Sequence, residues 1–201
     1  MFAGTICSHP QCRSVACTPF DKCFHHSSAQ ERELILSHLR SCLEAGGIIK
    51  DLSIVGGDFE GLDIKSSHVR ASNFSFSTFR GCDFTGSRLS SCFFDMCIFT
   101  DCRFDEVHAR YCVFSGSAFI RCTLTGSTMV ECNFMGIDSL SNDFSSSDLY
   151  FSNFSMARLL DTKMEDCNLK RVNFRASAIE RVSFLWSNPE EAFFRKEDEE
   201  S

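Results

Sequence analysis

Large apolar residues recur at every fifth position from Ile49 to Phe184. This register runs through 28 central positions without an insertion, and all but Ala109 and Ser139 hold a large apolar residue. Two residues before each centre lies a second position, which holds Gly, Ala, Ser, Thr, Cys or Val in 24 of 28 cases. The residue between the two is often Asp or Asn. The chain therefore turns one large and one small side chain inward in every five residues.

A period of five fits neither an α-helix nor a flat strand. Five steps on a helix of 3.6 residues per turn spread the apolar residues around its circumference. An odd step on a strand sends successive apolar residues to opposite faces. The pattern therefore predicts a chain that turns a corner about every five residues.

A second period of twenty predicts the number of sides. Central residues that are twenty positions apart form a column. The column that begins at Ile54 holds Phe at its six other positions, whereas the column that begins at Ile49 holds no Phe. Like residues thus stack on like residues in coils of four sides. Seven coils at the strand spacing of about 4.8 Å make a rod about 34 Å long. The predicted fold class is an all-β solenoid, in which each coil covers the hydrogen-bonding edge of its neighbour.

The composition supports this picture, since 22 of the 201 residues are Phe and 13 are Cys. The repeats resemble those of the pentapeptide-repeat protein family, whose consensus is A(D/N)LXX with Phe allowed at the centre. The segments Cys82-Asp83-Phe84 and Cys132-Asn133-Phe134 show the match, which extends over residues 47–184. The resemblance implies a right-handed quadrilateral β-helix. The best-understood members of that family mimic B-form DNA and bind DNA gyrase, and this binding can protect gyrase from quinolones.

The segments at the two ends of the repeat predict caps. Ser28 and Glu31 are spaced as in a capping box, and Gly46-Gly47 ends the apolar pattern that follows, which predicts a capping helix over residues 29–46. We divide the rest of the chain into a Cys/His-rich segment 1–28, a repeat 47–184 and a C-terminal segment 185–201. In the last segment Trp186, Phe193 and Phe194 are expected to cover the last coil or to form a homodimer contact, and an acidic tail follows over residues 195–201.

The cysteines fall into two groups. Eight occupy the small position of the repeat, where burial as small apolar side chains is expected; these are Cys82, Cys92, Cys97, Cys102, Cys112, Cys122, Cys132 and Cys167. The other five lie in residues 1–46, close to several histidines. A structural zinc site there would draw on Cys7, His9, Cys12, Cys17, Cys23 and His25. Unliganded structural thiols, a degenerate stretch of repeat and redox use are the alternatives, and no other cofactor is expected.

Charge weakens the expectation of DNA mimicry. The formal net charge of the chain is −7, but the repeat over residues 49–184 contributes only −3 and the C-terminal 17 residues contribute −4. Arg70, Arg110, Lys170 and Arg171 also lie along one edge, where a DNA mimic would need carboxylates. Binding to DNA gyrase is therefore the alternative hypothesis. Direct binding of nucleic acid is not expected either, because no strong basic stripe is present.

Outward-facing apolar residues predict a protein-binding surface instead. At one edge Ile120, Leu140 and Leu160 follow one another at the step of twenty, and near another edge lie Tyr111, Val130, Tyr150 and Phe151. Such contiguous apolar surface indicates a protein partner, unless residues 1–27 fold back over it. The repeat falters between Ile137 and Asn142. There we expect a bulge or an outward bend, with Leu140 turning inward and leaving the stripe.

Several functions are not expected from this sequence. No catalytic motif is found, and Asp105 and His108 lie on a regular face, so the chain is interpreted as a non-enzymatic interaction module. No run of 18 apolar residues occurs, which argues against a membrane partner. The first residues lack the features of a signal peptide, so a cytoplasmic location with reduced thiols is expected.

Overall fold

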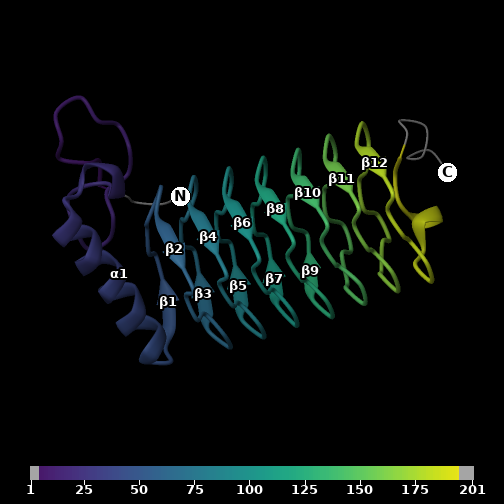
Figure 1. Ribbon diagram of the computed structural model, residues 1–201, viewed down its shortest axis with the longest axis horizontal. Helices are drawn as coiled ribbons and strands as arrows, with labels where there is room; N and C mark the ends of the chain where they lie inside the picture. The colour runs from purple at the N-terminus through teal and green to yellow at the C-terminus, as the bar shows by residue number, and fades with distance from the viewer. Residues whose placement is uncertain (1–4, 195–201) are drawn as a thin grey trace.

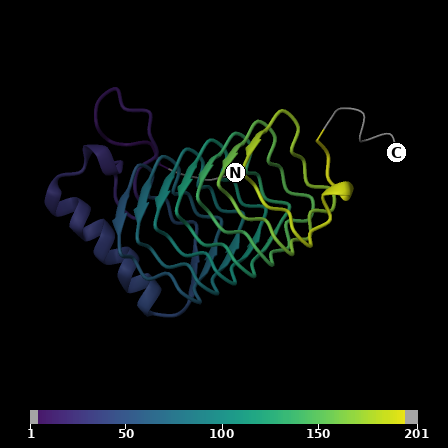
Figure 2. The same ribbon diagram turned by 45° about the vertical axis from the view of Figure 1, so that its right-hand side comes forward.

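The computed structural model describes residues 5–194, which form a four-sided, right-handed β-helix with a helical cap at its N-terminal end (Figure 1). The acidic tail predicted over residues 195–201 lies outside the described residues. Two parallel sheets form opposite sides of the rod, and neighbouring strands of each sheet are twenty residues apart in the chain. The predicted period of four sides is therefore confirmed. The view in Figure 2 shows the coils stacked along one axis.

The strands are short, with three residues each. One sheet contains β1 (Ile48–Lys50), β3 (His68–Arg70), β5 (Arg88–Ser90), β7 (His108–Arg110) and β9 (Thr128–Val130). The other contains β2 (Asp58–Glu60), β4 (Thr78–Arg80), β6 (Ile98–Thr100), β8 (Ala118–Ile120), β10 (Asp138–Leu140), β11 (Arg158–Leu160) and β12 (Ala178–Glu180). The other two sides are joined by single parallel bridges, such as Asn73 with Phe93.

Columns of Phe fill the interior of the rod. Rings of one column stack at centroid distances such as 5.0 Å between Phe114 and Phe134, and rings of neighbouring columns meet edge to face, as do Phe84 and Phe94. Each such pair contributes about 0.5–1.5 kcal/mol beyond the burial of area. The central positions are buried from Ile49 to Phe174, and only those of the last coil are partly open.

Where Ser or Cys holds the small position, its side chain commonly bonds to the main chain of the preceding coil, so the position serves hydrogen bonding as well as steric fit. The Ser117 hydroxyl accepts the Cys97 N–H at 2.8 Å and donates to the Phe94 carbonyl at 2.7 Å, so it joins two coils. The Cys97 thiol likewise donates to the Phe74 carbonyl at 3.1 Å. A hydroxyl or thiol here satisfies main-chain groups that would otherwise be buried without a partner.

The corners of the coils have left-handed backbone. Every fifth residue from Asp51 to Trp186 has a positive φ, between 47° and 72°. The Asp or Asn three residues earlier prepares this turn, since the Asn133 side chain accepts the Met135 N–H at 3.0 Å. Such an Asx turn lowers the cost of the tight corner. The sequence predicted a corner at this spacing, but not the sign of φ.

The expected bulge between Ile137 and Asn142 is wrong. Strand β10 is regular and pairs with both β8 and β11, and Leu140 points outward with 39 % of its surface exposed. Asn142 occupies the small position and makes the same two bonds as a serine there, to the Cys122 N–H at 2.7 Å and the Phe119 carbonyl at 2.8 Å. Its amide also donates to the Ser139 hydroxyl at 2.7 Å, so buried polar groups replace the missing apolar side chain without a distortion.

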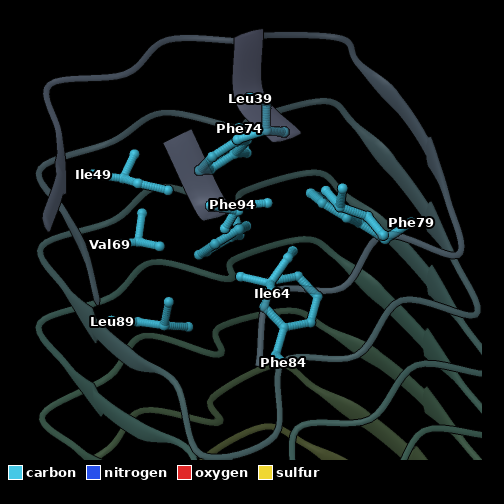
Figure 3. A pocket seen from close by; sticks show the side chains of 11 residues that line it. Leu39, Ile49, Ile64, Val69, Phe74, Phe79, Phe84, Leu89 and Phe94 are labelled. Atoms are coloured by element: carbon cyan, nitrogen blue, oxygen red, sulfur yellow. The ribbon is translucent and has the colours of Figure 1, made fainter. Parts of the chain in front are cut away.

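The N-terminal cap is the predicted helix, α1 (Ala29–Glu44), which begins at the Ser28–Glu31 capping box. Its buried residues are Ile35 and Leu39, and Leu39 lies over the Phe74 and Phe94 rings of the first coils (Figure 3). The apolar cavity below it measures about 10 Å³, so the cap closes the core almost completely. Within residues 5–194, no helix has the length and apolar character needed to cross a bilayer.

Residues 5–27 do not fold back across the apolar stripes. They contain a short 3₁₀ helix, η1 (Phe24–His26), and lie at the α1 end of the rod (Figure 1). Their bonds to the rod reach only the first coil, where the Thr18 N–H donates to the Ser53 carbonyl at 2.9 Å. The hypothesis that this segment covers Ile120 and Leu160 is therefore wrong for the described residues.

The C-terminal cap uses only part of the predicted aromatic set. After the 3₁₀ helix η2 (Pro189–Glu191), Phe194 continues the Phe column and stacks on Phe174 at 5.1 Å. Phe193 pairs with the main chain of the last coil and lies beside the Arg175 guanidinium. Trp186 takes no part in the cap, because it stands at a corner with 77 % of its surface exposed.

Candidate functional site

The stripe formed by Ile120, Leu140 and Leu160 is the most regular apolar feature on the surface. These residues end strands β8, β10 and β11 and are directly paired in register. Leu140 is exposed and the other two are half-buried. Because β10 has no bulge, all three side chains stay on one face, and Leu140 does not leave the stripe as the sequence analysis expected.

Ion pairs surround this stripe. Arg158 pairs with Asp138 at 3.3 Å along one side, and Arg121 pairs with Asp101 at 2.7 Å along the other. Thr100 and Glu180 lie at its two ends in the same row of the sheet. The surface therefore has a narrow apolar centre with a charged rim, the usual composition of a protein interface.

The second predicted patch is less continuous. Tyr111 and Phe151 are about half exposed at the same corner, and the Tyr150 and Phe151 rings lie 6.1 Å apart. Glu131 stands at this corner between them and bonds to Arg110 at 3.0 Å, while the Arg110 guanidinium covers the Tyr111 ring. Val130 and Tyr150 are half-buried beside them. Polar contacts thus divide this patch into two parts.

A third apolar patch was missed by the sequence analysis. Phe76 and Met96 occupy one corner in successive coils with 62 % and 54 % of their surfaces exposed, and Ile98 is 45 % exposed on β6. The Met96 side chain lies along the corner so closely that a Cβ atom on Gly116 would meet its sulfur at 2.5 Å. Sorting the corner positions by the step of twenty would have shown this pair.

The carboxylates of the rod are largely paired with cations. Hydrogen bonds from Arg121 hold the pKa of Asp101 below its usual value, and hydrogen bonds from Arg181 do the same for Asp161. Arg80 pairs with Asp58 and Lys163 with Asp143 in the same way, between successive coils. Such pairing neutralises the regular negative rows on which DNA mimicry depends.

The eight repeat cysteines are all buried, as predicted. Burial raises the pKa of Cys97 to about 12 and that of Cys167 to about 11. The Cys97 and Cys167 thiols each donate to a carbonyl of the preceding coil at 3.1 Å. These residues are therefore part of the packing and hydrogen bonding of the rod.

The predicted metal candidates divide into two sets. Cys7, Cys12 and Cys23 lie together with His26, and their ligand atoms are all within 4.8 Å of one another. His26 takes the place that the sequence analysis gave to its neighbour His25. The remaining candidates, His9, Cys17 and His25, lie outside the cluster of ligand atoms, although His9 stacks on the His26 ring at 3.8 Å.

The Asp105 side chain is held by hydrogen bonds within the β-helix. Its carboxylate accepts the hydroxyls of Thr123 and Thr125 at 2.8 and 2.7 Å and the Thr125 N–H at 3.0 Å. Burial alone would raise the pKa of Asp105, but these bonds and Arg103 hold it below its usual value. His108 is exposed on β7. The Asp105 carboxylate thus joins adjacent coils.

Comparisons with known proteins agree with this architecture. The family description "Pentapeptide repeats" matches eight copies over residues 58–95, 70–105, 97–136 and 143–184. No curated protein sequence matches the chain. Among solved structures, QnrB1, a plasmid-mediated fluoroquinolone resistance protein, is 21 % identical with a TM-score of 0.58, over 74 % of this chain and 80 % of its own.

A second solved structure is HetL, a pentapeptide repeat protein involved in heterocyst differentiation regulation from the cyanobacterium Nostoc sp. strain PCC 7120. It is 14 % identical with a TM-score of 0.26, over 85 % of this chain and 98 % of its own. The family match covers most of the β-helix described above. This chain therefore belongs to the pentapeptide repeat family.

Proposed function

We propose that this protein is a non-enzymatic scaffold that binds a partner protein through the Ile120–Leu140–Leu160 stripe. The observation that carries the proposal is the in-register stacking of three aliphatic side chains on successive strands of a rigid sheet. The partner would present a complementary apolar ridge with charged residues on both sides, to match the Arg158–Asp138 and Arg121–Asp101 pairs.

Burial of this stripe provides the driving force. A fully desolvated aliphatic side chain contributes about 1.5–3 kcal/mol, and the half-exposed residues here retain part of that surface for a partner. Because neighbouring coils hold the strands in place, binding would cost little ordering of the scaffold. The Tyr111–Phe151 and Phe76–Met96 patches are secondary contact candidates.

A photo-cross-linking experiment tests this proposal. A photoreactive amino acid is placed at Leu140, and at Ser90 on the opposite sheet as the matched position, and both proteins are produced in the native host. We expect one discrete adduct from position 140 and none from position 90. The adduct should disappear when Ile120→Ser and Leu160→Ser are added, and persist when Lys50→Ser and Arg70→Ser are added instead.

Two outcomes would contradict the proposal. The first is the absence of any adduct specific to position 140. The second is an adduct whose yield is insensitive to the Ile120→Ser/Leu160→Ser pair while circular dichroism shows an intact β-helix. In that case the contact would lie elsewhere on the rod.

Binding to DNA gyrase is the second candidate, supported by the family resemblance and by the shared fold with QnrB1. The paired carboxylates of the rod argue against it, since Asp58, Asp101 and Asp161 each contact an arginine. We expect no inhibition when the protein is titrated against gyrase in a supercoiling assay. Inhibition at micromolar concentration would favour DNA mimicry over the scaffold proposal.

A further inference from the structure

The segment before helix α1 has little apolar core of its own. Its described part, residues 5–27, contains one isolated antiparallel bridge, between Ile6 and Val15, and the single turn η1. Its buried apolar side chains are few, and three of them are cysteines. A segment of this length cannot bury enough apolar surface to offset its conformational entropy, so another source of stabilisation is needed.

We propose that Cys7, Cys12, Cys23 and His26 bind a structural zinc ion. Their ligand atoms converge from three separate places in the segment and lie within 4.8 Å of one another. Three thiolates and one imidazole form a common ligand set of structural zinc sites. The site lies beyond the end of the rod that α1 caps, away from the surfaces of the proposed scaffold (Figure 1).

The distances fit tetrahedral coordination. Zn–S bonds of about 2.3 Å and a Zn–N bond of about 2.0–2.1 Å separate two sulfurs by about 3.8 Å and a sulfur from the nitrogen by about 3.6 Å. The Cys12 and Cys23 sulfurs lie 4.0 Å apart. The His26 Nδ1 atom lies 3.6 Å from the Cys7 sulfur and 3.3 Å from the Cys23 sulfur.

Local backbone structure explains how two ligands come together. Cys23 and His26 are separated by two residues, the spacing of a CxxC pair, and the His26 N–H donates to the Cys23 carbonyl at 3.1 Å. The sequence analysis gave His25 as the histidine candidate, although His26 is the one at this spacing from Cys23. Cys12 ends a turn in which its N–H bonds to the His9 carbonyl at 3.1 Å, and the Cys7 N–H bonds to the Ser14 carbonyl at 2.9 Å.

The site is connected to the cap of the rod. Arg32 of α1 donates to the carbonyls of Phe24 and His25, both at 2.9 Å, and so holds the turn that carries two ligands. Lys22 bonds to Glu31 at 2.8 Å, in the first turn of the same helix. Since all four ligands come from the protein, no position remains for a substrate or water. We therefore assign the zinc a structural role and not a catalytic one.

Zinc uptake by the full-length protein tests the assignment. The reduced protein is stripped with a chelator, incubated with Zn²⁺, separated by gel filtration and analysed for zinc per chain. Binding requires three thiols to release their protons to the buffer, with the imidazole neutral. We expect one zinc per chain, and visible absorption from thiolate charge transfer and tetrahedral ligand-field bands when Co²⁺ replaces it.

Matched variants locate the metal. Cys12→Ser and His26→Gln each remove a direct ligand. Loss of an outer-shell partner lowers metal affinity about 10–100-fold, and these two variants should lower the zinc affinity by more than that. Cys42→Ser, at another half-buried cysteine, and His25→Gln, at the adjacent histidine, should bind zinc like the unaltered protein. Cys12→His, which offers a nitrogen ligand in place of the sulfur, should recover much of the affinity lost in Cys12→Ser and so separates loss of a ligand from misfolding.

Three results would overturn the assignment. One is the absence of stoichiometric zinc in the reduced, unaltered protein, whether or not a Cys12–Cys23 disulfide is found before reduction. Another is equal zinc affinity in Cys12→Ser and Cys42→Ser. The third is a cobalt spectrum without thiolate charge-transfer bands.

Discussion

Several serines at the small position of the repeat bond to two main-chain groups in the preceding coil. Ser147, for example, accepts the Ser127 N–H at 3.0 Å and donates to the Leu124 carbonyl at 2.7 Å. Asn142 makes the equivalent pair of bonds with a longer side chain. The sequence pattern predicted that this position is small. It could not predict that Asn142 fits, because the reason is hydrogen bonding across coils and not volume.

Substitution of Asn142 tests this explanation. Asn142→Ala leaves the buried Cys122 N–H without its side-chain acceptor, so we expect a loss of about 2 kcal/mol in the free energy of unfolding. Asn142→Ser should recover at least half of the loss, because serine makes both bonds at other coils. Chemical denaturation of the two variants is the measurement. Equal losses in both would show that the size of the amide, and not its hydrogen bonds, stabilises this coil.

Cysteine reactivity distinguishes the thiols of the rod from those of the cap. Burial raises the pKa of Cys97 to about 12, which leaves almost no thiolate at pH 8. Cys12 and Cys42 are only half-buried. In the native, metal-free protein we expect iodoacetamide to modify these two first and the eight rod cysteines only after unfolding, as measured by peptide mass spectrometry. Modification of Cys97 or Cys167 at a similar rate would indicate that the coils open locally.

At the scale of secondary structure, sequence periodicity predicted the coils but not the N-terminal segment. The step of twenty places Ile49 beside Val69 and Phe79 beside Phe99, as the register shows. A repeat fixes its own geometry because every coil meets the same neighbour. Residues 5–27 have no such repetition, so spacing alone could not distinguish His26 from His9 or His25. Helix α1 was predicted correctly because its capping box is a local signal.

The capping box also makes the cap sensitive to pH. The hydrogen bond from Lys22 and those from Ser28 lower the pKa of Glu31 to about 2. A lowered pKa means that this carboxylate stabilises the cap at any pH above the ordinary glutamate pKa of about 4.3, and that this stabilisation is lost as the pH falls through about 2. We expect hydrogen-exchange protection in the first turn of α1 to fall over that range.

Glu31→Gln provides the control for this pH dependence. It preserves the shape of the side chain but removes the charge that Lys22 contacts, so protection of the same turn should be lower at pH 7 and nearly constant down to pH 3. Amides of the central coils, such as that of Phe114, should keep their protection in both proteins. An identical acid profile in the variant would assign the pH dependence to another group.

At the scale of the whole molecule, the two ends of the rod are covered to different degrees. Helix α1 closes the first coil, and Ile49 and Ile64 beneath it are only 6 % exposed. At the other end Ile179 is 37 % exposed, although Phe194 stacks on Phe174. Leu185 and Trp186 are exposed at 52 % and 77 % in the same coil. A solenoid needs a polar covering at its ends to stay monomeric, and within residues 5–194 this end presents apolar side chains instead.

We therefore predict that two chains associate through their C-terminal ends. The mass from light scattering should be that of a dimer at high concentration, and Leu185→Ser/Trp186→Ser should reduce it to that of one chain. Phe76→Ser/Met96→Ser removes comparable apolar surface elsewhere and should leave the dimer intact. Trp186 is the only tryptophan, so its emission should shift to shorter wavelength as the unaltered protein is concentrated. A constant emission and a monomeric mass would mean that apolar exposure at this end is too small, or too scattered, to drive association.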